Sequence, residues 1–422
     1  MQVKTIALLP NLTLYLVPTE KFKTVEMNII FKGKVDPKLD ADLMLLAEVL
    51  SDSCRRYPKK REVEAYCDFL YRFSFRINNE HQMESDNFTL SCNFISPRYL
   101  PDDFDIVDKV FEFIHEIIYR PLLKDGAFDS EVVKIQQQKT ITLVNQFNDS
   151  KEYYSLLHLN DYINGEHPYK HSMIASEEEL KKVTPQSLYA AYLKLLERPI
   201  SIFIVGKFNE LHLNRMIIKH LRPGNEVTTP RLFVELPYNK MARYEVTKHF
   251  KQSQLSMVFL TPDINTSRVD NVALLFNYIF GSGSTSKLFK VVREEHNYCY
   301  TINSQLRTLS NSLVVSAGID DKNYEDTILL VYKQLDKMAK GEISDEEFTA
   351  GVESLKSQFM ASEDNGRSII VSIMNNLVRD LPYLPPQERV AELEKISKAD
   401  VVRFAKGVRF SYSFLLRQRG EK

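Results

Sequence analysis

Alternating apolar and polar residues identify the strands of this chain. The stretch NFTLSCNFI at residues 87–95 alternates over its whole length, which is the period of a half-buried antiparallel strand. Shorter apolar runs bounded by turn residues predict further strands in both halves of the chain. The predicted strands cover residues 12–17, 24–32, 73–77, 87–95, 200–205, 254–260, a group from 300 to 317, and 411–416.

Apolar residues at helical spacing predict helices between these strands. The first helix, Asp42 to Asp52, contains LMLLAEVL. It is apolar on nearly every side, so we expect it to be buried. Further helices are predicted at residues 60–71, 103–120, 129–147, 151–164, 185–196 and 269–280, with more helices between 317 and 408.

The order of elements repeats along the chain. LLAEVLSD at 45–52 lies over LLFNYIFG at 274–281 at an offset of 229, and FDSEVV at 128–133 lies over ISDEEF at 343–348 at an offset of 215. Two offsets that differ by about fifteen residues are expected for a duplicated domain with one change of loop length, so we favour a duplication over chance similarity between two α+β segments. We therefore predict an α+β protein of two tandem homologous domains, each an antiparallel sheet packed with helices.

A stretch rich in proline and glycine sets the predicted domain boundary. Residues 221–237 contain Pro223, Gly224, Pro230 and Pro237 and show no sustained period, which is typical of a linker. The predicted N-terminal domain is 1–222, the linker 223–240 and the C-terminal domain 241–422.

Composition narrows the function classes. The chain has 422 residues, is 44% hydrophobic and 26% charged, and has a net charge of -1. These values are ordinary for a globular protein and give no electrostatic reason to expect nucleic acid or an anionic membrane as a partner. Its four cysteines show no C-x-x-C spacing, which favours reduced thiols and a cytoplasmic location. No run approaches 18 apolar residues, so no membrane span is expected.

The stretch from Phe280 to Ile302, FGSGSTSKLFKVVREEHNYCYTI, is where we predict a ligand contact. A turn, Gly281 to Lys287, separates two helices, and a strand begins near Tyr300. Arg293 and Tyr300 face one space if the chain folds back between them. The turn lacks the glycine spacing of phosphate-binding loops, so a capped turn between helices is the favoured interpretation.

Residue motifs alone give no catalytic centre. The chain contains no G-x-S-x-G, no phosphate-binding loop motif and no H-x-x-E-H. HEIIY, His115 to Tyr119, has a tyrosine where H-E-x-x-H needs its second histidine, and we interpret it as the surface of an amphipathic helix. His167, His171 and Glu166 form a less favoured metal set, because Pro168 argues for a loop.

The stretch LFKVVREEHNYCYTI from Leu288 resembles the LFxxVRExxGLAYS signature of the insulinase and pitrilysin-type zinc peptidases, the inverzincins, which include the mitochondrial processing peptidase. The likeness covers the whole chain: LPNLTLYLVP at 9–18, TPQSL at 184–188 before a strand ending in VGKF, and GEISDEEF at 341–348. LLAEVLSDSCRRYPKKREVEAYCDFLY resembles in particular the degenerate bacterial subunits of the YmfF type. The resemblance implies two domains that form half of a clamshell.

The sequence departs from this family at the zinc site. Active members carry H-x-x-E-H on the first apolar helix, and alignment places the motif between Met44 and Val49, where no histidine occurs. The distal pair of family glutamates falls near Gln138 and Asn145, whose amides are poor zinc ligands and cannot act as a general base. The resemblance therefore implies no catalytic residue and no metal in this chain, with zinc expected only in a partner subunit.

The expected function is that of a non-catalytic subunit of a heterodimeric zinc metallopeptidase. The resemblance implies that Arg293 and Tyr300 bind the substrate, while a paralogous partner bearing H-x-x-E-H cleaves short or unfolded peptides. The chain would then have no catalytic activity of its own. A stand-alone peptide-binding or scaffold protein is the alternative, and a hydrolase using His167, His171 and Glu166 is a third, less favoured one.

Overall fold

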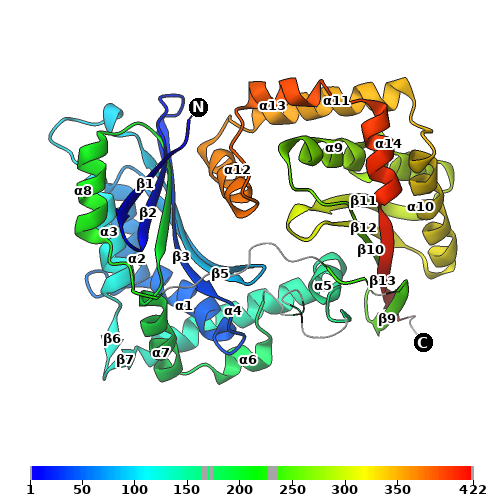
Figure 1. Cartoon of the computed structure of the whole chain (residues 1–422). Helices are drawn as coiled ribbons and strands as arrows, with labels where there is room; N and C mark the ends of the chain where they lie inside the picture. The colour runs from blue at the N-terminus through cyan, green and yellow to red at the C-terminus, as the bar shows by residue number, and fades with distance from the viewer. Residues whose placement is uncertain are drawn as a thin grey trace. The chain divides into compact units, whose positions relative to one another are not determined.

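The computed structural model describes residues 2–163, 167, 170, 174–226, 236–238 and 240–419. The chain divides into two compact units (Figure 1). Unit 1 comprises residues 1–145, 173–232 and 365–374, and unit 2 comprises residues 146–172, 233–364 and 375–422. Each unit contains one main β-sheet.

Unit 1 is built on a six-stranded sheet in the order β1-β2-β8-β3-β5-β4. The alternation predicted for residues 87–95 is present in β5, where Phe88, Leu90, Cys92 and Phe94 are buried in the core. The strands are β1 (Lys4–Leu9), β2 (Leu12–Val17), β3 (Thr24–Lys34), β4 (Ser74–Gln82), β5 (Ser85–Ile95) and β8 (Ile200–Val205). A separate short hairpin consists of β6 (Leu123–Lys124) and β7 (Ala127–Phe128).

Unit 2 is built on a five-stranded sheet in the order β11-β12-β10-β13-β9. Its central strand β10 is buried along most of its length because it pairs with a strand on each side. The strands are β9 (Ala242–Lys248), β10 (Ser253–Leu260), β11 (Cys299–Arg307), β12 (Ser312–Ile319) and β13 (Arg409–Gln418).

The two sheets share one topology, and this confirms the prediction of two homologous α+β domains. Strands β2-β8-β3-β5-β4 of unit 1 correspond in order and direction to β9-β13-β10-β12-β11 of unit 2. Each sheet is antiparallel except for one parallel pair, β2 with β8 and β9 with β13. In both units the last strand follows a helix, and such a crossover can return the chain in the parallel direction.

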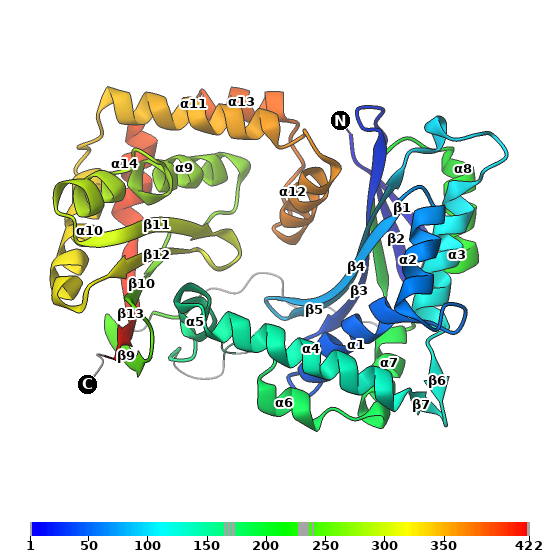
Figure 2. The ribbon, with the colours of Figure 1, turned by 180° about the vertical axis from the view of Figure 1, so that it is seen from behind.

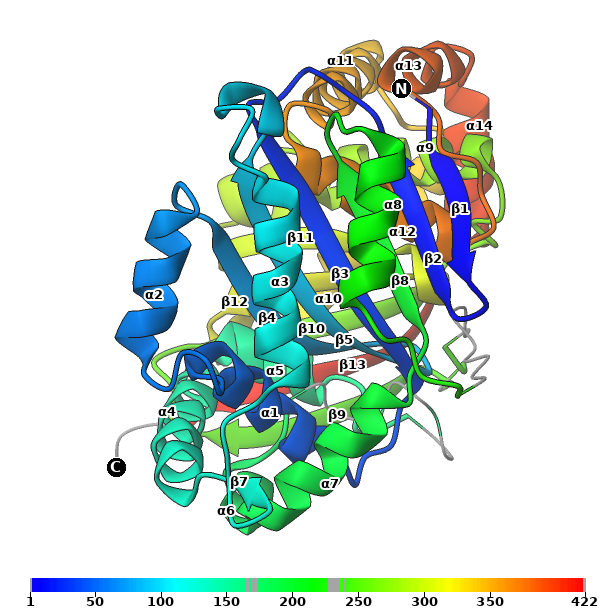
Figure 3. The same cartoon turned by 90° about the vertical axis from the view of Figure 1, so that its left-hand side faces the viewer.

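Helices cover one face of the sheet in unit 1. The cluster they bury includes Met27, Ile29 and Phe31 of β3 and Leu45 and Ile114 of the helices. Figure 3 shows α3 and α8 lying across this sheet. The helices are α1 (Asp40–Asp52), α2 (Lys60–Phe69), α3 (Ile106–Tyr119), α4 (Ser130–Asn148, which ends in unit 2), α6 (Glu177–Lys182), α7 (Pro185–Leu196) and α8 (Glu210–His220).

A second cluster of helices covers the sheet of unit 2 (Figure 2). Its core includes Met257 and Phe259 of β10 together with Leu275, Phe276 and Phe404 of the helices. The helices are α9 (Ser267–Asn277), α10 (Tyr324–Ala339), α11 (Asp345–Ala361), α13 (Pro386–Leu393) and α14 (Lys398–Gly407).

Two further helices pack outside the half of the sequence to which they belong. Helix α5 (Lys151–His158) comes from the N-terminal half but is part of unit 2, and most of α12 (Gly366–Val378) comes from the C-terminal half but is part of unit 1. Helix α5 packs in unit 2, where the hydroxyl of Ser155 lies 2.9 Å from that of Ser256 on β10. The first nine residues of α12 join unit 1, where a Cβ on Gly366 would lie 2.6 Å from Cγ of Glu26. The compact units therefore exchange a segment each, while the linker at 223–240 stays a prediction.

No helix among the described residues is both long and apolar enough to cross a bilayer.

Helix α1 offers a matched pair of substitutions. Leu45 is fully buried, whereas Glu48 on the same helix is exposed. We expect Leu45→Ala to lower the free energy of unfolding by about 2 to 5 kcal/mol because it leaves a cavity, and Glu48→Ala to change it by less than about 0.5 kcal/mol. Urea unfolding followed by circular dichroism measures both, and equal effects would contradict the packing of α1.

Candidate functional site

The predicted helix, turn, helix and strand around residue 290 are all present in unit 2. Helix α9 continues into a π-helical turn, Tyr278–Ser282, and a second π-helical segment covers Phe289–Glu295. Strand β11 then begins at Cys299. Wide π-helical turns are rare and occur often at functional sites, so this segment differs from an ordinary helix hairpin.

The turn between these helices is packed against the rest of unit 2. Both carboxylate oxygens of Glu347 accept hydrogen bonds of 2.9 Å from the ammonium of Lys287, and both side chains are largely buried. A Cβ on Gly281 would lie 2.5 Å from the hydroxyl of Ser304. The lysine is thus paired within the protein, which supports the interpretation as a structural turn.

Arg293 lies on the exposed side of the second π-helical segment. Its guanidinium stacks over the ring of Phe289, with 4.7 Å between its central carbon and the ring centroid. Burial raises the pKa of the Cys299 thiol to about 11, and the positive charge of Arg293 opposes that shift. The chain therefore folds back as predicted, bringing Arg293 within electrostatic reach of the residue that precedes Tyr300.

Tyr300 occupies a β-bulge. Cys299 pairs with Ile319 and Thr301 pairs with Gly318, so Tyr300 is an extra residue without a partner on β12. Its side chain is 64% exposed. Bulges redirect side chains and are common beside functional sites.

A tight turn precedes this bulge, and a small pocket lies beside it. Asn297 adopts a left-handed conformation with φ of 54°, and the amide of Tyr298 donates to the carbonyl of Val292. Tyr300 lines a pocket of about 300 Å³ together with polar residues that include His296, Asp320 and Lys322. Arg293 and Tyr300 are thus both on the surface of unit 2, and their role in binding substrate stays a prediction.

Helix α1 contains packing residues where the resemblance places the zinc motif of active peptidases. Leu45 and Val49 are buried, Met44 is half-buried, and Glu48 points to solvent. Among the described residues, no group of three or more histidine, cysteine, aspartate or glutamate side chains is arranged to hold a metal ion. Glu166 and His171 lie outside those residues, and a chain free of metal stays a prediction.

Helix α4 contains the two amides that the resemblance aligns with the distal glutamates of the family. Gln138 and Asn145 are exposed, and Asn145 donates to Glu177 of α6 over 2.7 Å. The buried amide is instead Gln136, which donates to Asp52 at the end of α1 over 2.8 Å. Because an α-helix has about 3.6 residues per turn, two residues correspond to about half a turn, which is enough to change the face.

The HEIIY stretch is the last part of α3, and its side chains contact the end of α8 and the residues after it. His115 Nδ1 is 2.8 Å from the carbonyl oxygen of His220, and the hydroxyl of Tyr119 donates to the carbonyl of Arg222 over 3.1 Å. Burial raises the pKa of Tyr119 to about 12. The predicted helix surface is therefore in part a contact between α3 and the end of α8.

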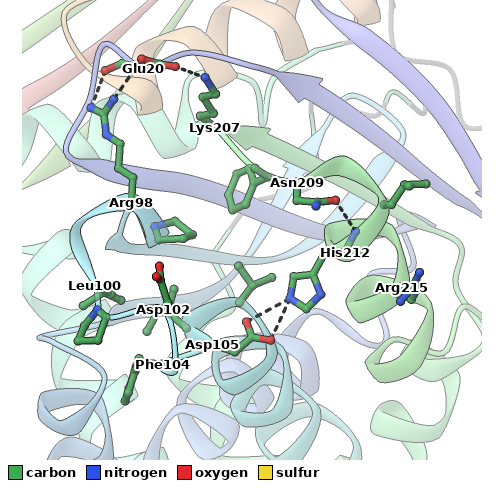
Figure 4. A pocket seen from close by; sticks show the side chains of 16 residues that line it. Glu20, Arg98, Leu100, Asp102, Phe104, Asp105, Lys207, Asn209, His212 and Arg215 are labelled. Atoms are coloured by element: carbon green, nitrogen blue, oxygen red, sulfur yellow. Dashed lines mark hydrogen bonds and ion pairs between the residues drawn. The ribbon is translucent and has the colours of Figure 1, made fainter.

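A pocket of about 960 Å³ in unit 1 was not predicted from the sequence. Figure 4 shows Glu20 between Arg98 and Lys207, and His212 facing Asp105 with Nε2 to Oδ2 at 2.9 Å. Most of its charges are thus paired with one another, which leaves few groups free for a ligand. Its residues come from three separate loops and from the N-terminal parts of α3 and α8, and they carry no spacing that a sequence search would detect.

Comparison with known proteins gives a consistent picture. The family model described as "Peptidase M16 inactive domain" matches residues 182–355. The chain is 24% identical over 412 residues to the "Probable inactive metalloprotease YmfF" of Bacillus subtilis, covering 96% of each chain.

Two solved structures resemble the fold over the full chain. A conserved protein from Enterococcus faecalis superimposes with a TM-score of 0.91 at 24% identity, covering 100% of this chain and 99% of that one. A peptidase M16 inactive domain from Pseudomonas fluorescens superimposes with a TM-score of 0.80 at 13% identity, covering 100% of both chains. At these identities the likeness supports the fold.

The buried Lys287 provides a test of the turn. We expect Lys287→Ala to lower the free energy of unfolding by about 3 kcal/mol, because it leaves the Glu347 carboxylate buried without its partner. Lys290→Ala, at an exposed position on the same segment, should change it by less than about 0.5 kcal/mol. Urea unfolding measures both effects. If Lys287→Ala left the free energy of unfolding unchanged, the lysine would be available for a ligand.

Proposed function

We propose, from the confirmed resemblance to the insulinase and pitrilysin-type peptidases, that this chain is the non-catalytic subunit of a two-chain zinc metallopeptidase. It would close a chamber around short or unfolded peptides and bind them through Arg293 and Tyr300. A paralogous chain bearing H-x-x-E-H would supply the zinc and the general base. This chain would then need no metal of its own.

One contrast between the two units carries the proposal. In unit 1, the helix that bears the zinc motif in active relatives packs Leu45 and Val49 into the core. In unit 2, the segment that resembles the family signature exposes Arg293 and places Tyr300 on a bulge. Packing thus accounts for the residues of α1, whereas it does not account for the exposed pair.

The chemistry of the pair suits an extended peptide. A guanidinium offers several fixed N–H donors, which can bind successive backbone carbonyl oxygens. A tyrosine hydroxyl can donate to the oxygen of a peptide carbonyl as negative charge develops there. Neither group can activate water as a metal-bound site does, so both are suited to binding and positioning the substrate.

Peptide cleavage by the reconstituted pair tests the proposal. We expect Arg293→Ala and Tyr300→Phe each to lower kcat/KM by about tenfold to a hundredfold, because each removes a donor to the bound peptide. Lys290→Ala is the matched control, an exposed cation three residues before Arg293. Unchanged kcat/KM in both variants would overturn the assigned role.

Zinc analysis separates this function from the alternatives. We expect the purified chain alone to bind no stoichiometric zinc and to cleave no peptide, since α1 lacks ligands. Elemental analysis and a peptidase assay, with and without the paralogous subunit, measure this. Peptide binding without any such partner would instead favour a stand-alone binding protein, and tight zinc in the isolated chain would overturn both.

A further inference from the structure

Four charged side chains from four elements meet at one end of the sheet in unit 1. His81 lies near the end of β4, Asp86 near the start of β5, Asp40 at the start of α1, and Arg198 just before β8. Their side chains are 7%, 1%, 15% and 5% exposed, respectively. We call these four residues the hairpin cluster, because two of them belong to the β4–β5 hairpin.

The contacts inside the hairpin cluster are close. Arg198 donates to Oδ2 of Asp86 over 2.7 Å. His81 Nε2 lies 3.0 Å from Oδ1 of Asp40 and 3.7 Å from Oδ1 of Asp86. A Cβ at Gly33 would lie 2.5 Å from Nε of Arg198, so glycine at this position leaves space for the guanidinium.

The charges of the hairpin cluster balance in one protonation state of His81. Two carboxylates face one guanidinium, so a neutral imidazole leaves one negative charge without compensation. Oδ1 of Asp86 is buried and accepts no hydrogen bond from the described residues. An uncompensated buried charge is costly, and a proton on His81 provides the missing positive charge.

Other acidic groups near the hairpin are directed elsewhere. Glu80 is exposed and accepts a hydrogen bond of 2.6 Å from Asn78 on its own strand. Asp42 of α1 accepts one of 2.6 Å from Ser187. The groups whose charge acts on His81 are therefore Asp40, Asp86 and Arg198.

The balance of these effects favours the charged imidazole. Burial lowers the pKa of His81, but the carboxylate of Asp40, 3.0 Å away, and the negative charge of Asp86 outweigh burial and the charge of Arg198, so the pKa is raised. A raised folded-state pKa adds stability that is complete below the unfolded value of about 6.5 and is lost as pH rises through the folded value.

We propose that the hairpin cluster is a pH-sensitive latch that fastens the β4–β5 hairpin to α1 and to the start of β8, and that it loosens when His81 loses its proton. The hairpin forms the edge of the sheet in unit 1, because β4 pairs only with β5. Loosening would therefore free one end of an edge strand while the central strands stay paired. This inference does not depend on the proposed peptidase role.

Amide hydrogen exchange on the full chain tests the latch. We expect protection factors in β4 and the first residues of β5 to fall as the pH rises above about 6.5, by about tenfold for each unit by which the folded pKa of His81 exceeds the unfolded one. Protection in β2 should not change over this range. A flat profile in the hairpin would overturn the proposal.

Three variants separate titration of His81 from other causes. His81→Gln should remove the pH dependence, and Asp40→Asn should move it to lower pH, because it removes the charge that holds the proton. His212→Gln is the control, since His212 also pairs with a carboxylate in unit 1 but is 37% exposed, and should leave the profile unchanged. If His81→Gln retains the wild-type profile, or fails to fold while Asp40→Asn shows no shift, the latch is wrong.

Discussion

Each main sheet has two faces, and apolar side chains on a face are buried only where another element packs against it. Helices from the same half of the sequence cover one face. A helix from the other half packs with each sheet as well, α5 with that of unit 2 and α12 with that of unit 1. The exchanged helices pack closely, since Ser155 meets Ser256 at 2.9 Å and Gly366 leaves no room for a side chain beside Glu26. Neither half of the sequence therefore contains all the residues of a unit, and each half depends on the other for burial.

The same dependence on burial explains the residues of the first helix. A catalytic zinc helix must keep polar ligands on one face, and a polar group left buried without a ligand destabilises the fold. In α1 the buried positions are Leu43, Leu45, Leu46, Ala47, Val49 and Leu50, whose side chains need no hydrogen-bond partner. Apolar residues at these positions make α1 a structural element of the core. A zinc site on α1 would require several polar residues to enter that core together.

Local patterns predicted most of the fold because they reflect burial directly. The alternation in β5, the apolar period of α1 and the repeat of element order all appeared in the structure. Strand β9 was missed although its sequence ARYEVTK alternates apolar and polar residues, because it is a short edge strand whose apolar residues are only half-buried. Helix α8 was missed because few of its residues are buried and its Leu211 is 73% exposed.

Contacts between residues that are far apart in the sequence could not be predicted from short sequence patterns. The hairpin cluster joins residues more than 100 positions apart, as the pairing of Arg198 with Asp86 shows. Which amide of α4 reaches Asp52 also depends on packing between distant helices, and in the structure it is Gln136. The exchange of α5 and α12 likewise depends on packing against strands far away in the sequence.

Stability and function can be told apart at Tyr300. A tyrosine retained for packing would be buried within the sheet, yet this one is 64% exposed and lies on a bulge where it has no partner on β12. Arg293 forms no ion pair with the described residues and contacts Phe289 on its own segment. Replacing exposed residues of this kind changes the free energy of unfolding little. A large effect of either residue on peptide cleavage would therefore have to come from contact with another molecule.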